Sequence, residues 1–90
     1  MDNRTFVIAE IGNSHNGNFK YAVNAINFAK KAGADAVKFQ YLKPEELVHP
    51  NLKPYDPYSK FKSQLEKSQN ITLKLDDYKK LSKYAHKKKI

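Results

Sequence analysis

The sequence contains no cysteine, a single arginine and no long apolar run. Without cysteine, disulfide bonds, thiolate metal sites and cysteine nucleophiles are excluded. A membrane-spanning helix needs about 18–20 predominantly apolar residues in a row, and no stretch approaches that length. The opening residues MDNRTFVIAE also lack the basic segment and the long apolar segment of a secretory signal peptide. We therefore expect a soluble cytoplasmic protein with no membrane partner.

Basic residues outnumber acidic ones by 17 to 9, which gives a formal net charge of +8. A basic face can bind nucleic acid by neutralising phosphates. However, base recognition and bidentate phosphate binding favour arginine, and Arg4 is the only one. Many lysines lie between Lys79 and Lys89, near the end of an expected helix, where they complement its dipole. We interpret the charge as a solvated face and expect no nucleic-acid partner. A small non-catalytic basic module that binds nucleic acid or an anionic polymer remains the alternative.

The first half of the chain predicts a βαβ unit. Residues Thr5 to Ile11 (TFVIAEI) are rich in β-formers and indicate a strand buried on both faces. A polar loop follows, and Phe19 to Ala32 then has apolar residues at helical spacing, with Gly33 in position to end the helix. Asp35 to Tyr41 (DAVKFQY) predicts a second strand. Short connections in this order favour parallel strands.

The second half begins with a long irregular stretch, from Tyr41 to Lys62, that contains all four prolines. Its interspersed apolar side chains lead us to expect that it packs against the rest of the protein; they are Leu42, Leu47, Val48, Leu52, Tyr55, Tyr58 and Phe61. A short helix is expected over Lys62–Gln69 and an amphipathic one over Leu75–Lys88. A third strand would continue the pattern after Ile90. Residues 1–90 therefore resemble one part of a larger domain.

Three polar side chains fall on one side of the predicted sheet. Side chains alternate along a strand, so Glu10 lies on one face of the first strand, and Lys38 and Gln40 share a face of the second. The helices would cover the purely apolar faces. Ligands of parallel α/β proteins bind at the carboxyl ends of the strands, where these residues lie. The alternative is structural, with Glu10 and Lys38 as an ion pair and Gln40 as a hydrogen-bonded core amide.

The three histidines do not predict a metal site. His15 lies in the loop after the first strand, His49 in the proline-rich stretch and His86 on the basic helix. Their spacing does not bring them together as ligands. His15 is instead expected to bond its neighbours in the loop.

Three stretches resemble the opening of the sialic acid synthase family, which includes the enzymes that make N-acetylneuraminic, legionaminic and pseudaminic acids. They are FVIAEIGNSHNG, AKKAGADAVKFQ and SQLEKSQNITLKLDDYKKLSKYAHKKKI. The resemblance implies an α/β fold, namely the N-terminal portion of a (β/α)8 TIM barrel. The chain would supply the first two βα units and the long loop after the second strand. A complete barrel takes about 250 residues, so the barrel would be incomplete in residues 1–90.

The resemblance also implies a reaction: condensation of phosphoenolpyruvate with an N-acetylated amino sugar such as N-acetylmannosamine, with release of phosphate. By similarity, Glu10 would act on the attacking water, Lys38 would bind phosphoenolpyruvate, and Gln40 would lie near the sugar and its aldehyde. His15 and Asn16 would shape the loop. The family uses a divalent metal, Mn or Mg, and is often homodimeric. Its metal-binding histidines match none of the three here, so no metal ligand is expected in this chain.

The sequence departs from the family pattern at two positions. Ser14 stands where many members have Asn, and Lys74 stands where a helix-capping Ser is common, which should weaken the start of that helix by about 1 kcal/mol. Because much of the family's site lies on later strands, we expect the isolated 90 residues to have no condensation activity.

Overall fold

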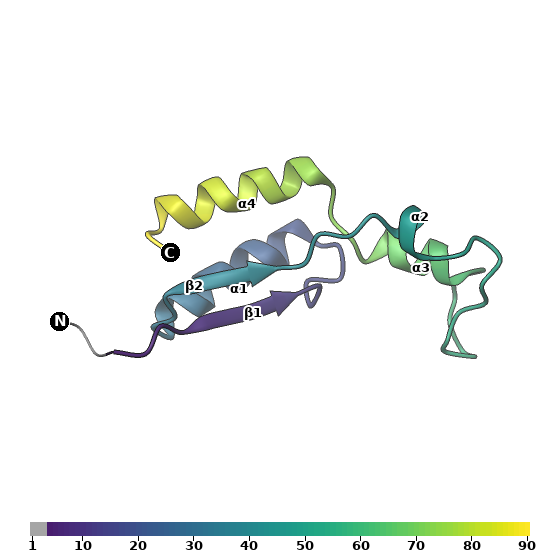
Figure 1. Cartoon of the computed structure of the whole chain (residues 1–90), viewed down its shortest axis with the longest axis horizontal. Coiled ribbons are helices and arrows are strands. Elements are labelled where there is room, and N and C mark those ends of the chain that lie inside the picture. The colour runs from purple at the N-terminus through teal and green to yellow at the C-terminus, as the bar shows by residue number, and fades with distance from the viewer. Residues whose placement is uncertain (1–3) are drawn as a thin grey trace.

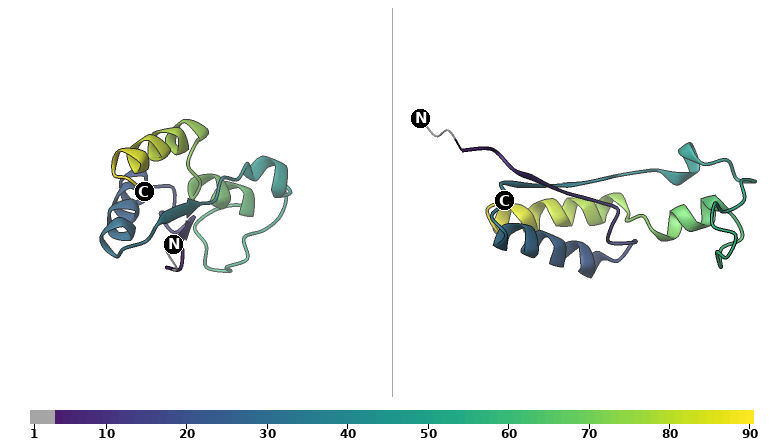
Figure 2. Two further views of the ribbon diagram at one scale, coloured as in Figure 1. Left: turned by 60° about the vertical axis from the view of Figure 1, so that its left-hand side comes forward. Right: turned by 90° about the horizontal axis from the view of Figure 1, so that it is seen from below.

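The computed structural model describes residues 4–90. Its elements follow in the order β1 (Ile8–Gly12), α1 (Phe19–Lys31), β2 (Ala36–Phe39), α2 (Pro44–Leu47), α3 (Gln64–Asn70) and α4 (Leu75–Lys87). The two strands pair in parallel, with α1 as the crossover, so the predicted βαβ unit is confirmed. Helices α1 and α4 lie side by side against one face of the sheet, whereas α2, α3 and their loops extend away from it (Figures 1 and 2). Within residues 4–90, no helix is long and apolar enough to span a bilayer.

Helix α1 begins and ends where its sequence predicts. Asn18 caps the first turn, because its side-chain oxygen accepts a hydrogen bond from the Tyr21 amide at 3.1 Å. At the other end Gly33 adopts a φ of +91°, and its N–H donates to the Lys30 carbonyl at 3.1 Å. Between them, buried small and branched residues form the inward stripe: Ala22, Ile26 and Ala29.

The hydrophobic core joins α1, α4 and the helix-facing side of β2. Its buried members are Ala22, Ile26, Leu73, Leu81 and Ala85, and Val37 and Phe39 of β2 pack against them. Tyr84 adds a polar link between the helices, because its hydroxyl donates to the Asn27 side-chain oxygen at 2.6 Å. At the start of α4 the Lys74 side chain makes no capping bond, and the Asp77 carboxylate accepts from the Lys74 amide instead.

The expectation that the first strand is buried on both faces is wrong. Phe6, Val7 and Ile8 are 65%, 49% and 56% exposed, and β1 begins only at Ile8. The physical reason is the size of the sheet. Two helices cover one face of two strands, and the described residues leave the opposite face and the outer edge of β1 open to water.

The irregular stretch after β2 packs less closely than its apolar residues indicate. Leu47, Leu52, Tyr55 and Tyr58 are exposed, so the expectation of packing is wrong for them, whereas Leu42, Val48 and Phe61 are partly buried. Short-range hydrogen bonds hold this stretch, such as the Tyr58 amide to the Asp56 carboxylate at 2.9 Å. Helix α2, which starts at Pro44, was not predicted, although proline is common at the first position of a helix.

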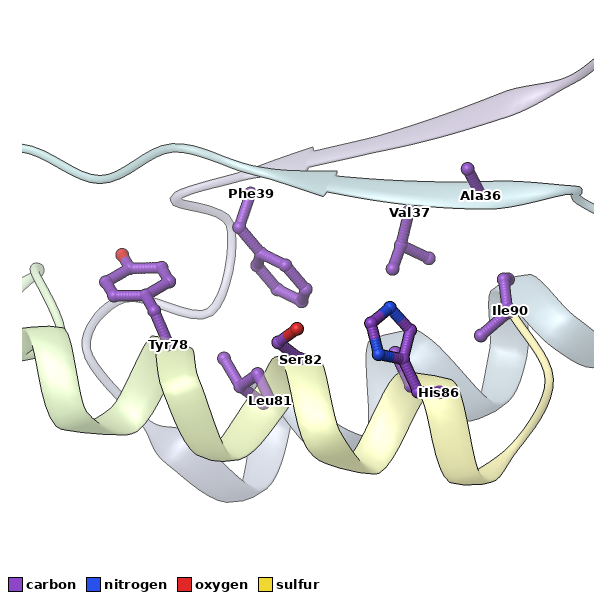
Figure 3. Close-up of a pocket in the computed structure, with 9 residues that line it drawn as sticks. Ala36, Val37, Phe39, Tyr78, Leu81, Ser82, His86 and Ile90 are labelled. Carbon is purple, nitrogen blue, oxygen red and sulfur yellow. The ribbon is translucent and has the colours of Figure 1, made fainter.

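A hollow of about 380 Å³ lies between β2 and α4 (Figure 3). Val37 and Phe39 point into it from the strand, and Leu81, His86 and Ile90 line it from the helix side. Because Val37 and Phe39 alternate with Lys38, this hollow lies on the helix-facing side of β2. It is therefore separate from the face that carries the polar residues.

Candidate active site

Glu10 and Lys38 are direct neighbours in the parallel sheet. Their Cα atoms are partners in the ladder, and both side chains are exposed on the face away from the helices. No ion pair within 4 Å joins these two residues, although the structural alternative requires one. A carboxylate and an ammonium group are thus placed side by side and left available to a ligand.

An irregularity at Gly12 brings Gln40 to the same place. The register shifts between Glu10 and Gly12, so that two steps along β1 match one step along β2. The Gln40 amide then donates to the Gly12 carbonyl at 3.3 Å. A Cβ atom at Gly12 would lie 3.9 Å from the Glu10 Oε1 and 4.0 Å from the Gln40 Oε1. The carboxylate and the side-chain amide therefore flank the bare backbone of Gly12, and Glu10, Lys38 and Gln40 form one cluster.

Two residues that sequence reasoning did not select hold Gln40. The Tyr78 hydroxyl, from α4, donates to the Gln40 backbone carbonyl at 2.8 Å. The Asn13 side-chain Nδ2 donates to the Gln40 Oε1 at 3.3 Å. Gln40 is exposed, so it is not the core amide of the structural alternative. Asn13 looks like an ordinary loop former in the sequence, and Tyr78 looks like part of an apolar stripe, so neither carried a signal of this contact.

His15 anchors the loop between β1 and α1. Its side chain is 2% exposed, and its ring lies against Phe39 and Tyr78, with centroids 6.2 and 6.4 Å away. Nδ1 accepts a hydrogen bond from the Gly17 amide at 2.9 Å, and Nε2 is buried with no partner among residues 4–90. Burial lowers the pKa of His15, because the charged ring would lose its hydration. The ring is therefore neutral at pH 7.

Two residues of this loop adopt left-handed backbone conformations. Asn16 has a φ of +52°, and its N–H donates to the Asn13 carbonyl at 3.0 Å. Gly17 has a φ of +77°, and a Cβ there would overlap the backbone carbonyl oxygen of Asn70 at the end of α3. The loop thus turns tightly and rests directly on α3, which needs a glycine at position 17.

The remaining titratable groups do not join the cluster. Asp35, before β2, accepts from the Val7 amide at 2.8 Å and pairs with Arg4 at 2.7 Å. These two contacts, the backbone hydrogen bond first, hold the pKa of Asp35 below its ordinary value. Asp35 belongs to the amino-terminal end of β2, at the far end of the strand from Gln40. Among residues 4–90, no three His, Cys, Asp or Glu side chains gather as a metal site.

Comparison with known proteins identifies the family. The NeuB family model matches residues 25–90. The chain is 36% identical over 88 residues to N,N'-diacetyllegionaminic acid synthase of Campylobacter jejuni, an alignment that covers 93% of this chain and 26% of the relative. It is 35% identical over 83 residues to human N-acetylneuraminate-9-phosphate synthase, an alignment that covers 89% of this chain and 23% of the human protein.

A solved structure supports the same relationship. The spore coat polysaccharide biosynthesis protein spsE of Bacillus subtilis superposes on the whole chain with a TM-score of 0.64 and 30% identity. The match covers 23% of that structure, and the chain likewise spans about a quarter of the two synthases. The resemblance read from the sequence is confirmed, and the chain belongs to the NeuB family.

Proposed function

We propose that this chain supplies the first two strands of a (β/α)8 barrel in a sialic-acid-type synthase. The observation that carries the proposal is the cluster of Glu10, Lys38 and Gln40 on the open face of β1 and β2. Active sites of such barrels are built at the carboxyl ends of the strands, where these residues lie. Family membership favours this function over the basic module that binds nucleic acid.

The proposed reaction condenses phosphoenolpyruvate with the open-chain form of an N-acetylated amino sugar such as N-acetylmannosamine. The alkene carbon of phosphoenolpyruvate bonds to the aldehyde carbon, and the aldehyde oxygen takes up a proton. Water adds to the cationic carbon that results, and phosphate leaves. The product is a nonulosonate.

Each residue type fits one part of this chemistry. Glu10 would accept the proton of the attacking water, as a general base does. The Lys38 ammonium would offset the charge of the phosphate and carboxylate of phosphoenolpyruvate. Gln40 would hydrogen-bond an oxygen of the amino sugar. Because Glu10 and Lys38 are ladder neighbours, the sheet holds their backbones side by side, with the base and the anion-binding group on the same face.

A divalent metal, Mn or Mg, is expected from the resemblance to the family. The described residues do not fit such a site, because they bring together no group of three metal-ligating side chains. The roles proposed here therefore involve protein side chains alone. Cytoplasmic location and a homodimeric assembly stay predictions.

A chimera tests the proposal. In it, the matching segment of the Campylobacter synthase is replaced by this chain, and phosphate release from phosphoenolpyruvate is measured with that enzyme's amino sugar. We expect activity in the chimera, and we expect Glu10→Gln to lower kcat by about 10²–10⁴-fold, the usual contribution of a general base. Glu45→Gln, the same change on the exposed helix α2, is the matched control.

Two results would contradict the proposal. One is near-normal turnover by a folded Glu10→Gln chimera, which would remove Glu10 from the reaction. The other is an inactive chimera whose circular dichroism and melting match those of the parent enzyme. The 90-residue chain alone is expected to release no phosphate, because the described residues form only one part of the site.

A further inference from the structure

The side-chain NH₂ group of Gln40 is its one polar group without a protein partner among residues 4–90. The backbone N–H donates to Gly12, the backbone carbonyl accepts from Tyr78, and the side-chain Oε1 accepts from Asn13. The residue is exposed, so the NH₂ group is open to a ligand. An exposed glutamine normally rotates freely. Here the two polar groups of the side-chain amide differ, because the Oε1 is bonded to Asn13 and the NH₂ group has no protein partner among residues 4–90.

Asn13 is well placed to impose this difference. Its own backbone carbonyl accepts from the Asn16 amide at 3.0 Å, which fixes it in a tight turn. Its side-chain oxygen is buried, with no hydrogen-bond partner in the described part of the chain. The same turn is held to the core by the buried ring of His15. The flexible Gln40 side chain is therefore bonded, through the Asn13 Nδ2, to a residue whose backbone is held in a tight turn.

We propose that Asn13 is a positioning residue that holds the Gln40 amide with its NH₂ group toward the ligand. This inference rests on the proposed function and deepens it. The Oε1 atoms of Glu10 and Gln40 both lie near Gly12, and the bond from Asn13 to the Gln40 Oε1 leaves the Gln40 NH₂ group as the donor for a ligand on the same open face. A matching ligand group carries an acceptor oxygen next to an O–H donor. A carbonyl with a neighbouring hydroxyl or a bound water, as in an open-chain sugar, has that pattern.

If Gln40 were reversed, its oxygen would face the ligand together with the Glu10 carboxylate. Two acceptors would then meet the acceptor oxygen of the ligand, and one hydrogen bond would be replaced by a repulsive contact. Asn13→Asp tests this directly, because a carboxylate is nearly isosteric with the amide and can only accept. The substitution should turn the Gln40 amide around, so that its NH₂ group donates to position 13.

The first measurement is hydrogen exchange of the side-chain amides, by NMR on the 90-residue chain. In the unsubstituted chain, Asn13 NH₂ protons should exchange about five-fold more slowly than those of Gln40, as one ordinary hydrogen bond gives. In Asn13→Asp, slow exchange should appear at Gln40 instead. Asn13→Leu, which removes the bond without adding charge, should leave Gln40 unprotected. Asn24→Asp, an identical change on the exposed side of α1, should alter neither.

The second measurement uses the chimera with the Campylobacter synthase, so that folding of the isolated chain is not required. Asn13→Asp should raise KM for the amino sugar about tenfold, because the amino sugar loses one hydrogen bond and gains a repulsive contact, and should leave KM for phosphoenolpyruvate nearly unchanged. Asn24→Asp should change neither. Protection at Gln40 before substitution, or equal effects on both KM values, would overturn the inference. A chimera that is inactive before substitution would count against the proposed function. The hydrogen-exchange measurement on the 90-residue chain would still test the orientation of the Gln40 amide independently.

Discussion

Replacing Gly17 with alanine should destabilise the protein more than any other glycine substitution in the described chain. Two costs combine at this position. A φ of +77° strains any L-residue by about 1–2 kcal/mol. The added Cβ would also overlap the Asn70 carbonyl oxygen, and that neighbour is backbone, which cannot rotate away as a side chain can. Overpacking of this kind adds about 1–3 kcal/mol, so we expect a total of about 2–5 kcal/mol.

Gly33 offers a matched control within the same chain. It also has a positive φ, of +91°, but a Cβ there would meet no atom within 4 Å. Gly33→Ala should therefore lower the free energy of unfolding only by the cost of the backbone conformation, about 1–2 kcal/mol. The difference between the two variants isolates the contact between the β1–α1 loop and the end of α3.

Urea denaturation followed by far-UV circular dichroism gives the two free energies of unfolding. Hydrogen exchange then locates the damage, which should appear as lost protection in α3 (Gln64–Asn70) for Gly17→Ala but not for Gly33→Ala. If Gly17→Ala is no more destabilised than Gly33→Ala, the loop does not rest on α3 and the explanation is wrong.

Two further predictions concern the core. The folded pKa of His15 lies below its ordinary value of 6.5, so the stability that its neutral ring confers is complete above that pH and is lost as the pH falls through the folded pKa. His15→Phe should flatten this part of the pH–stability curve, and the exposed His86→Phe should not. Leu81→Ala, at a side chain 2% exposed, should cost about 2–5 kcal/mol by urea denaturation. Leu75→Ala, at a residue 48% exposed on the same helix, should cost less than about 1 kcal/mol.

The sequence was sufficient to predict the face of the sheet on which Glu10, Lys38 and Gln40 meet. Strand side chains alternate with a strict period of two. Once the apolar face of a strand is recognised, the residues on its polar face follow, whatever the strand packs against. The ends of α1 were predictable for a similar reason, because Asn18 and Gly33 act through bonds within a few residues. Local rules determine all of these features.

Contacts between distant parts of the chain were not predictable in this way. The bond from Asn13 to Gln40 depends on the register shift at Gly12, which no periodic pattern indicates. The bond from Tyr78 to Gln40 joins residues 38 positions apart and depends on the angle at which α4 packs. The exposure of Ile8 was missed because an apolar side chain suits a buried position, but the sequence does not show whether another element packs on it.

The open face of β1 and β2 links stability to chemistry. Opposite charges 4 Å apart interact by about 1 kcal/mol in water and by several times more where water is excluded. Glu10 and Lys38 are exposed and form no ion pair within 4 Å, so their mutual attraction in water is weaker still. Ile8 lies two positions before Glu10, on the same face, and is 56% exposed. A layer that packs on Ile8 gains apolar burial and removes water from Glu10 by the same contact. In the proposed barrel, packing over this face would therefore strengthen the interactions of the three polar side chains with a ligand.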